Sequence, residues 1–152
     1  MKGGKNVSDS KEIAEMLSAI SIVSQNLAEQ IPRNETLKMI YVASPLRGDV
    51  QRNINQATNY CRFVVSKGFI PIAPHIYFTR FLNDEIEKER EIGMLLGKEI
   101  LKKCNELWVF MQNGKTSSGM REEVTEAQKL GIPIRYFNDG KMKGEHDEER
   151  SN

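Results

Sequence analysis

Three segments of this sequence carry residues that could bind an anion or attack the carbon of a sugar. The first is residues 44–49, SPLRGD, which follow an apolar run and precede a helical pattern. Backbone N–H groups at a helix N-terminus and the planar guanidinium of Arg47 both suit a phosphate, so we predict an anion site there. The alternative is that Arg47 pairs with Asp49 or another surface carboxylate, while Gly48 only permits the turn. The segment has neither the GxxxxGK[ST] pattern of a Walker loop nor the GxGxxG pattern of a dinucleotide turn.

The second segment, residues 74–84, carries His75, one of the two histidines of the chain. The aromatic residues near it are Tyr77, Phe78 and Phe81. Aromatic rings could stack on the flat face of a base or sugar, and a histidine could exchange a proton with it. The alternative is that His75 caps a helix beginning near Pro74 and that the aromatic rings belong to the core.

The third segment, residues 116–119 (TSSG), opens the helical pattern MREEVTEAQKL. Hydroxyl groups and unpaired N–H groups converge at such a helix start, which makes a second candidate phosphate site. The alternative is that Ser118 only caps the helix.

Two glutamates, Glu122 and Glu123, follow in the first turn of this helix, where acidic residues ordinarily favour the helix dipole. The spacing of Met120, Val124 and Ala127 predicts that these residues face a sheet. Glu123 then lies beside that buried stripe and can face a cleft, whereas Glu122 points more outward. A carboxylate facing the cleft could act as a nucleophile on a sugar carbon, so Glu123 is the candidate nucleophile.

The elements that must position these segments are predicted by the hydrophobic pattern. Strand-length apolar runs occur at residues 37–43, 69–73, 106–111 and 132–137. They alternate with helical patterns over about 50–67, 85–103 and 120–130. Such alternation predicts an α/β fold with a single doubly wound, mostly parallel sheet, Rossmann-like or flavodoxin-like, flanked by helices. Ligands of such sheets bind beyond the carboxyl ends of the strands, where all three segments fall.

An extra amphipathic helix is predicted before the first strand, over residues 11–30. Its apolar stripe consists of Ile13, Leu17, Ile20, Val23, Leu27 and Ile31. Asp9 and Glu12 could form its capping box. We therefore expect an N-terminal helical appendage over 1–36, an α/β domain over 37–137 and a disordered polar tail over 138–152. The helix either packs on its own domain or joins copies of the chain into a homo-oligomer.

The composition excludes several classes of function. The 152 residues include 22 basic and 21 acidic ones, a net charge of +1, so no strong positive field is available to bind a nucleic-acid polymer. No apolar run approaches the ~20 residues that span a bilayer, and the first residues lack the apolar core of a signal peptide. The cysteines, Cys61 and Cys104, stand alone. We therefore expect a cytoplasmic protein with no membrane partner, no metal and no cofactor.

Taken together, the three segments resemble the nucleoside 2-deoxyribosyltransferase superfamily over about residues 37–137. The first strand and loop of that superfamily are similar to IYVASPLRGD, and the segment with its glutamate nucleophile is similar to SSGMREEVTEAQKLGIPI. The likeness is greatest to the 2′-deoxynucleoside 5′-monophosphate N-glycosidases, whose corresponding loop also holds an arginine near the substrate phosphate. A narrower likeness, to small proteins common in bacteria and their phages, runs from YVASPLRGD through PIAPHIYFTRFL to CNELWVF and SSGM.

The resemblance implies a small-molecule partner, a nucleoside or nucleotide, and an enzyme that breaks its N-glycosidic bond. It places Glu123 in attack on C1′ to form a covalent glycosyl-enzyme, with Tyr41 beside it. Water or a second base would then give hydrolase or deoxyribosyltransferase chemistry. It also implies that Arg47, Ser117 and the N–H of Gly119 hold a phosphate. The full set of expected substrate-binding residues is Ser44, Pro45, Arg47, Gly48, Ser117, Ser118, Gly119 and Met120.

One departure from the superfamily concerns the acid that protonates the leaving base. The superfamily places an aspartate about eight residues before the Asp that precedes its third strand, and these positions hold Gly97 and Asn105 here. Glu99 is the nearest carboxylate, and His75 could also supply a proton. The alternative function is a non-catalytic protein that binds a nucleotide or nucleotide-derived signal, as a sensor or sponge. A third hypothesis makes the N-terminal helix the functional part, an interaction handle on an inert scaffold.

Overall fold

The computed structural model describes residues 7–138, except for the side chains of residues 7–10, 12, 13, 16 and 20. The expected polar tail lies outside this range from residue 139 onward. The side chains of the expected capping box, Asp9 and Glu12, also lie outside the described part, as do those of Ile13 and Ile20 in the apolar stripe.

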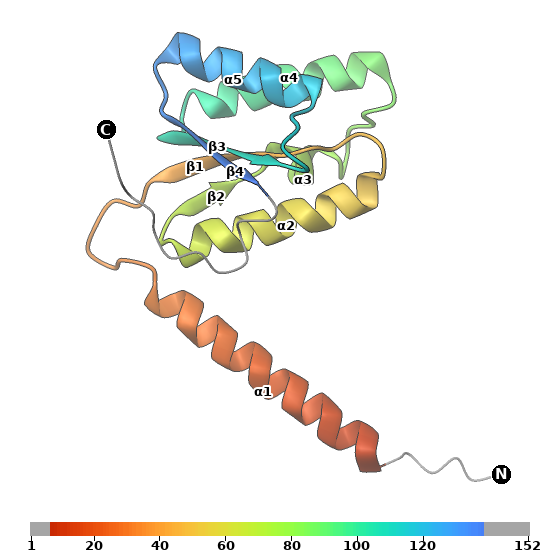
Figure 1. The fold of residues 1–152 in the computed structure, drawn as a ribbon, viewed down its shortest axis with the longest axis vertical. Helices are drawn as coiled ribbons and strands as arrows, with labels where there is room; N and C mark the ends of the chain where they lie inside the picture. Colours follow the sequence, from red (N-terminus) through yellow and green to blue (C-terminus); the bar gives the residue numbers. More distant parts are fainter. Residues whose placement is uncertain (1–6, 139–152) are drawn as a thin grey trace, which may run out of the picture.

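The chain folds around one sheet of parallel strands, which lie in the order β2-β1-β3-β4 (Figure 1). The strands are Met39–Ala43 (β1), Ile70–Ile72 (β2), Glu106–Met111 (β3) and Ile134–Asn138 (β4). The expected α/β class is confirmed, and over the described residues every strand pairing is parallel. The chain adds β2 on one side of β1 and then crosses to β3 on the other side. The loops after β1 and β3 therefore diverge at the carboxyl edge and leave a crevice between them.

Helices cover both faces of the sheet, which is the doubly wound arrangement (Figure 1). Helix α2 (Val50–Ser66) packs on one face, and α4 (Glu87–Leu101) and α5 (Ser118–Leu130) pack on the other. The short α3 (Pro74–Phe78) follows β2 and contacts both α2 and α4. Pro74 stands in its first turn, where a missing N–H group breaks no helical hydrogen bond. The helix near Pro74 that the sequence left as an alternative is therefore present.

Side-chain alternation along the strands divides the core into two layers. On the α2 face, Ile40 and Val42 pack with an aromatic group that includes Trp108. Tyr41 and Ala43 point to the opposite face, where the side chains of α4 and α5 cover them. This parity aims the Tyr41 ring, only 1% exposed, at the helix that carries Glu123.

The N-terminus of α5 is fixed by Ser117, not by Ser118 as the sequence analysis considered. The Ser117 hydroxyl accepts a 3.3 Å hydrogen bond from the backbone N–H of Met120, and Ser118 is the first helical residue. The helix ends at Gly131, whose φ of +68° is a left-handed conformation that glycine adopts at low cost. The start of α5, and with it Glu123, is therefore set by local capping.

Helix α1 (Val7–Glu29) projects away from the α/β domain (Figure 1). Three of its described apolar side chains are exposed: Leu17 by 62%, Ile22 by 54% and Val23 by 46%. The turn after the helix approaches the domain at Gly68, where a Cβ atom would lie 2.8 Å from the Gln30 carbonyl oxygen. The described side chains of α1 therefore form no packed layer with the domain, contrary to the alternative that this helix docks on it.

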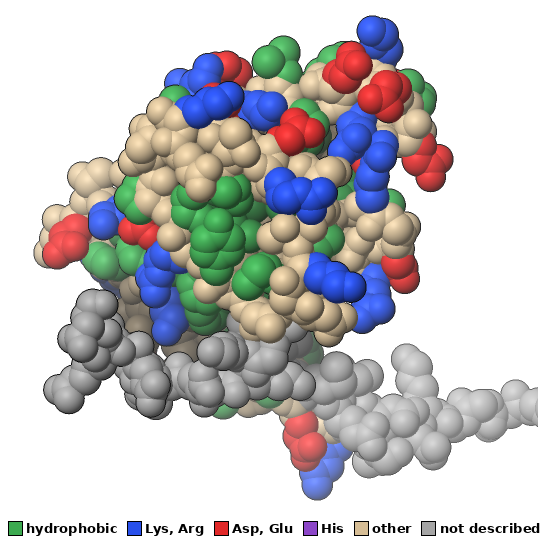
Figure 2. Space-filling view, turned by 45° about the horizontal axis from the view of Figure 1, so that its top comes forward, with side chains coloured by type: hydrophobic (Ala, Val, Ile, Leu, Met, Phe, Trp, Pro, Cys, Tyr) green, Lys and Arg blue, Asp and Glu red, His purple; other side chains and the backbone are tan. Residues whose placement is uncertain are grey.

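The outer surface mixes charges of both signs. On the face shown in Figure 2, Lys and Arg side chains alternate with Asp and Glu, and hydrophobic side chains gather between them. This pattern agrees with a net charge of +1. Within residues 7–138, no helix combines the length and the apolar composition needed to cross a bilayer.

A chain that begins at Leu37 should fold as stably as the full chain, because the described apolar side chains of α1 contribute little buried surface. We expect its melting temperature to stay within about 3 °C of the full-length value. Circular dichroism melts of both chains provide the measurement. A drop of about 10 °C or more would show that residues 1–36 belong to the same cooperative unit, against the expected division of the chain.

Candidate active site

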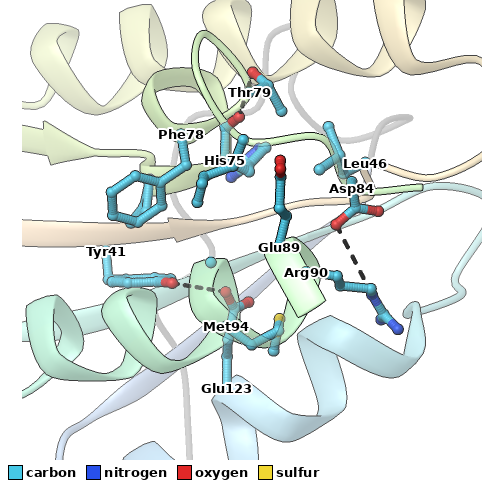
Figure 3. Close-up of a pocket in the computed structure, with 13 residues that line it drawn as sticks. Tyr41, Leu46, His75, Phe78, Thr79, Asp84, Glu89, Arg90, Met94 and Glu123 are labelled. Atoms are coloured by element: carbon cyan, nitrogen blue, oxygen red, sulfur yellow. Dashed lines mark hydrogen bonds and ion pairs between the residues drawn. The ribbon is translucent and has the colours of Figure 1, made fainter. Parts of the chain in front are cut away.

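A tyrosine–glutamate pair joins the central strand to the second turn of α5; because the helix begins at Ser118, Glu122 and Glu123 do not lie in its first turn as predicted. The Tyr41 hydroxyl donates a 2.7 Å hydrogen bond to Oε1 of Glu123 (Figure 3). Glu123 faces inward because its helix neighbours Met120 and Val124 pack against the sheet. Glu122 instead extends outward and forms a 3.2 Å ion pair with Lys98. The pair thus holds one carboxyl group at the crevice in a fixed orientation.

Burial controls the protonation of this pair. It raises the pKa of Glu123 from its ordinary 4.5 to about 7; the hydrogen bond from Tyr41 and the charge of Lys98 act in the opposite direction, while the charge of Glu122 adds to the rise. The pKa of Tyr41 lies well above its ordinary value, mainly through burial and then through the charge of Glu123. Tyr41 therefore remains a hydrogen-bond donor. Glu123 can serve as a nucleophile when ionised or as an acid when protonated.

A serine–histidine pair lies on the other side of the crevice. Ser44, at the end of β1, and His75, in α3, share a hydrogen bond of 2.8 Å between Oγ and Nε2. Burial lowers the pKa of His75 from 6.5 to about 4, so the ring is neutral at physiological pH. A neutral imidazole can donate or accept this bond, according to which nitrogen carries its proton. The pair can therefore pass a proton in either direction.

Two adjoining cavities meet at Glu123 and His75, which line both. The first has a volume of about 70 Å³ and apolar walls that include Phe78 and Met94 (Figure 3). The second, of about 150 Å³, is lined by the start of α5 and by the loop after β1. A ligand with a flat apolar part and an anionic part could occupy both cavities, with Glu123 between its two parts.

The loop after β1 is held by a buried asparagine on α2. The Asn53 side chain donates to the backbone carbonyls of Leu46 (3.0 Å) and Arg47 (2.9 Å). Gly48 turns the chain with a φ of +94°, and the Asp49 side chain caps α2 by accepting from the N–H of Arg52. These contacts fix the backbone from which the Arg47 side chain extends toward the crevice.

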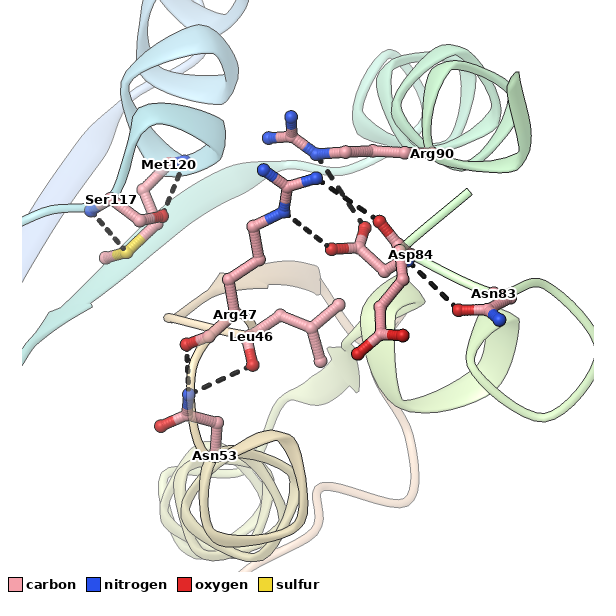
Figure 4. Close-up of polar contacts among 9 residues, drawn as sticks. Leu46, Arg47, Asn53, Asn83, Asp84, Arg90, Ser117 and Met120 are labelled. Atoms are coloured by element: carbon pink, nitrogen blue, oxygen red, sulfur yellow. Dashed lines mark hydrogen bonds and ion pairs between the residues drawn. The ribbon is translucent and has the colours of Figure 1, made fainter. Parts of the chain in front are cut away.

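Arg47 and Arg90 meet at one carboxylate, that of Asp84 (Figure 4). Arg47 Nε donates to Asp84 Oδ2 at 3.0 Å, and Arg47 Nη2 donates to the Asp84 carbonyl at 3.3 Å. Arg90 Nε lies 3.8 Å from Asp84 Oδ1. Arg47 therefore does pair with a carboxylate, but its partner is Asp84 and not Asp49. All three residues line the second cavity.

The structure brings together most of the residues that the sequence singled out. The second cavity is lined by Ser44, Arg47, His75, Ser117, Ser118, Gly119, Met120 and Glu123, and the first by Tyr41. Gly48 lies on an open groove outside them, which Arg47 also borders, and Pro45 is half-buried in the loop after β1. Glu99 does not join the site: it is exposed on α4 and pairs with Lys102. Of the aromatic residues near His75, Phe78 lines the first cavity, whereas Tyr77 and Phe81 are exposed.

Gly97, the position to which the resemblance assigns the acid, lies beside Tyr41. A Cβ atom on Gly97 would lie 3.0 Å from the Tyr41 hydroxyl oxygen, so a side chain there would require Tyr41 to shift by a few tenths of an ångström. Asn105 has a structural role instead, because its side chain accepts a 2.7 Å hydrogen bond from the N–H of Met39. That contact lies at the amino ends of β1 and β3, the edge opposite the crevice.

Sequence reasoning missed several residues that shape the site, among them Asn53, Asp84, Glu89, Arg90 and Met94. Asn53 has a detectable signal, since it is a polar residue one turn after Val50 on the apolar stripe of its helix. Arg90 has none, because it stands among the charged residues of KEREIG at the start of α4. Only the packing of α4 beside the loop after β1 reveals its partners.

Comparisons with known proteins show which proteins this chain is similar to. A family model described as "Domain of unknown function (DUF7768)" matches residues 38–137. Among solved structures, the chain is similar to a 2-deoxyribosyltransferase from Bacillus psychrosaccharolyticus, with 18% identity, a TM-score of 0.50, and coverage of 72% of this chain and 76% of that one. A 2-deoxyribosyltransferase from Leishmania mexicana shows 17% identity and a TM-score of 0.47, over 66% of this chain and 64% of that one. No curated protein matches the chain. The similarity to the Bacillus enzyme confirms the expected resemblance as a shared fold.

Replacing Glu123 with Gln should stabilise the protein above neutral pH. The folded-state pKa of about 7 exceeds the ordinary 4.5, so protonated Glu123 stabilises the fold below about pH 4.5 and this contribution is lost as the pH rises through 7. Glutamine mimics the protonated form at every pH. We expect Glu123→Gln to match the wild type near pH 4.5 and to exceed it by roughly 2–3 kcal/mol above pH 8, in urea melts across this range.

Glu122→Gln is the matched control, since this neighbouring carboxylate is exposed and ion-paired. Its difference from the wild type should change far less with pH, because the Glu122 charge contributes less than burial to the raised pKa of Glu123. Equal stability of Glu123→Gln and wild type at pH 8 would mean that Glu123 keeps an ordinary pKa in the folded chain.

Proposed function

The chain belongs to the DUF7768 family, and we propose that it cleaves the N-glycosidic bond of a deoxynucleoside or a deoxynucleoside 5′-monophosphate. The observation that carries this proposal is the position of Glu123, held by Tyr41 at 2.7 Å where an apolar cavity meets one lined by arginines and a helix N-terminus. The fold shared with a 2-deoxyribosyltransferase supports it. A base in the first cavity and a 5′ group in the second leave the sugar beside Glu123.

The first step is attack of ionised Glu123 on C1′ of the sugar. The Tyr41 hydroxyl engages Oε1 and leaves Oε2 for the attack. A C1′–O bond forms, the C1′–N bond breaks, and the base leaves with the bonding electron pair. The product is a glycosyl ester of the enzyme, formed through an oxocarbenium-like transition state that a nearby carboxylate stabilises.

The departing base needs a proton, and His75, which lines the first cavity, can supply it. The ring is neutral without ligand because burial lowers its pKa to about 4. A phosphate bound in the adjoining cavity would favour the charged imidazolium and so raise that pKa. His75 lines the first cavity and can donate this proton to a base bound there, while the Ser44 hydroxyl, 2.8 Å from Nε2, holds the ring in place. This route takes the place of the aspartate that the resemblance would put at Gly97.

The second step releases the sugar. Water that attacks C1′ of the ester restores the Glu123 carboxylate and gives a hydrolase, whereas a second base gives a deoxyribosyltransferase. In the hydrolytic case, the neutral His75 ring can accept the proton of the attacking water.

A second candidate function is nucleotide binding without turnover, as a sensor or sponge. The observation that favours it is again Gly97, because a slow proton transfer to the base would leave the sugar–base bond intact. Stabilisation of the chain by a nucleotide in a thermal-shift assay, together with no release of base, would establish this function in place of the first.

Glu123→Gln should abolish release of the base. Wild-type chain incubated with the four common deoxynucleosides and their 5′-monophosphates should release free base, detected by liquid chromatography and mass spectrometry. We expect the rate to fall by about 10³-fold or more in Glu123→Gln, since the nucleophile is lost. Glu122→Gln, the exposed neighbour, should stay within about threefold of wild type. Absence of free base with every substrate, or equal rates in Glu123→Gln and wild type, would refute the proposal.

The rate should rise with pH through an inflection near 7, because the ionised form of Glu123 attacks and its pKa is about 7. Tyr41→Phe removes a hydrogen bond that lowers this pKa, so its inflection should move to higher pH. Initial rates of base release between pH 5 and pH 9 measure both effects. A wild-type rate that shows no rise between pH 5 and pH 7 would contradict attack by ionised Glu123.

A further inference from the structure

The cluster of Arg47, Asp84 and Arg90 is more than a surface ion pair. Its three members come from separate elements: the loop after β1, the loop between α3 and α4, and the first turn of α4. The Arg90 side chain is only 19% exposed and that of Asp84 25% exposed. Two guanidinium groups at one carboxylate leave one positive charge uncompensated within the cluster.

The geometry decides which edges of the guanidinium groups remain available. Asp84 faces the Nε of Arg47 at 3.0 Å and the Nε of Arg90 at 3.8 Å. Arg47 also donates a hydrogen bond from Nη2 to the Asp84 carbonyl oxygen. In the described part of the chain, Nη1 of Arg47 and both Nη groups of Arg90 have no hydrogen-bond partner. Figure 4 shows the two guanidinium groups close together, beside Asp84.

The opposite wall of the same cavity supplies further donors. Ser117, Ser118 and Gly119 line it together with both arginines. The backbone N–H groups of Ser118 and Gly119 belong to the first turn of α5 and so have no acceptor within the helix. They also lie at the positive end of the helix dipole. A group with several anionic oxygens would accept from both walls at once.

We propose that Arg90 binds the phosphate of the substrate together with Arg47, and that Asp84 is the positioning residue that holds the two guanidinium groups side by side. The site then selects a substrate with a terminal phosphate monoester over an uncharged nucleoside. The inference rests on the proposed function in one respect, since that function identifies the part of the ligand other than the phosphate. The binding of the phosphate is inferred from the two arginines and the start of α5.

Asp84 acts as a positioning residue and not as a competitor of the phosphate, because it engages the inner Nε edges. A phosphate at the outer Nη edges places the arginines between two anions, which satisfies their donors on both sides. Without the carboxylate, the two like charges would repel each other and separate. Loss of Asp84 should therefore weaken phosphate binding, although it removes a negative charge from the site.

The test is isothermal titration of the full chain with inorganic phosphate, with each of the four common deoxynucleoside 5′-monophosphates and with the matching nucleosides. We expect Arg90→Gln to weaken binding of inorganic phosphate and of the monophosphates by about tenfold or more. Asp84→Asn should weaken it about three- to tenfold, and Arg90→Lys should restore only part of the loss because lysine cannot present a planar fork. The preference for monophosphate over nucleoside should shrink by the same factors.

Two variants control for charge alone. Arg62→Gln removes an exposed positive charge on α2, and Glu85→Gln removes the exposed negative charge next to Asp84. Both should stay within about twofold of the wild type. Circular dichroism melts identify any variant that unfolds; if Asp84→Asn does so, Arg90→Gln and Arg90→Lys decide the matter.

The inference is overturned if Arg90→Gln binds phosphate as the wild type does, if Asp84→Asn binds it more tightly, or if nucleosides bind as well as monophosphates. Its failure is distinct from failure of the proposed function. If the chain releases base from nucleosides and shows no preference for monophosphates, the inference is refuted and the proposed function stands. If monophosphates bind through Arg90 but no base is released, the proposed function is refuted and the inference stands.

Discussion

The hydrogen bond between Tyr41 and Glu123 is the constraint on which the rest of the site depends. It requires the Tyr41 side chain, on the central strand, to lie in a buried layer of the core. It also requires the Glu123 carboxyl group to be buried near the start of α5. Gly97 on α4 lies close to this contact, since a Cβ atom there would lie 3.0 Å from the hydroxyl oxygen. Any side chain at that position would therefore crowd Tyr41.

The parallel sheet explains why side chains from distant parts of the sequence meet at this point. The loops after β1 and β3 diverge at the carboxyl edge, and α3 and α4 close the crevice from the side of β2. Local hydrogen bonds then position the side chains of the site: Ser117 caps α5, and Asn53 holds the loop that carries Arg47. The first cavity has apolar walls near Phe78, and the second is lined by arginines and by the backbone amides at the start of α5. Glu123 lies between the two cavities.

Local patterns were enough to predict the sheet and most of the cavity lining, but not the contacts between separate elements. The apolar runs marked each strand, and the stripe of Met120, Val124 and Ala127 distinguished Glu123 from Glu122. Asp84 and Arg90 could not be found in this way, because their meeting with Arg47 depends on how α4 packs. Glu99 was proposed from its nearness in sequence to Gly97, yet two positions along a helix turn a side chain to another face.

The most direct test of the central claim is intact-protein and peptide mass spectrometry of the chain quenched during reaction with a deoxynucleoside 5′-monophosphate. If Glu123 is the nucleophile, the protein gains the mass of one deoxyribosyl phosphate group, the modified peptide contains Glu123, and Glu123→Gln acquires no such mass. Base released from the wild type with no adduct on Glu123, or with an adduct on another residue, would contradict the account.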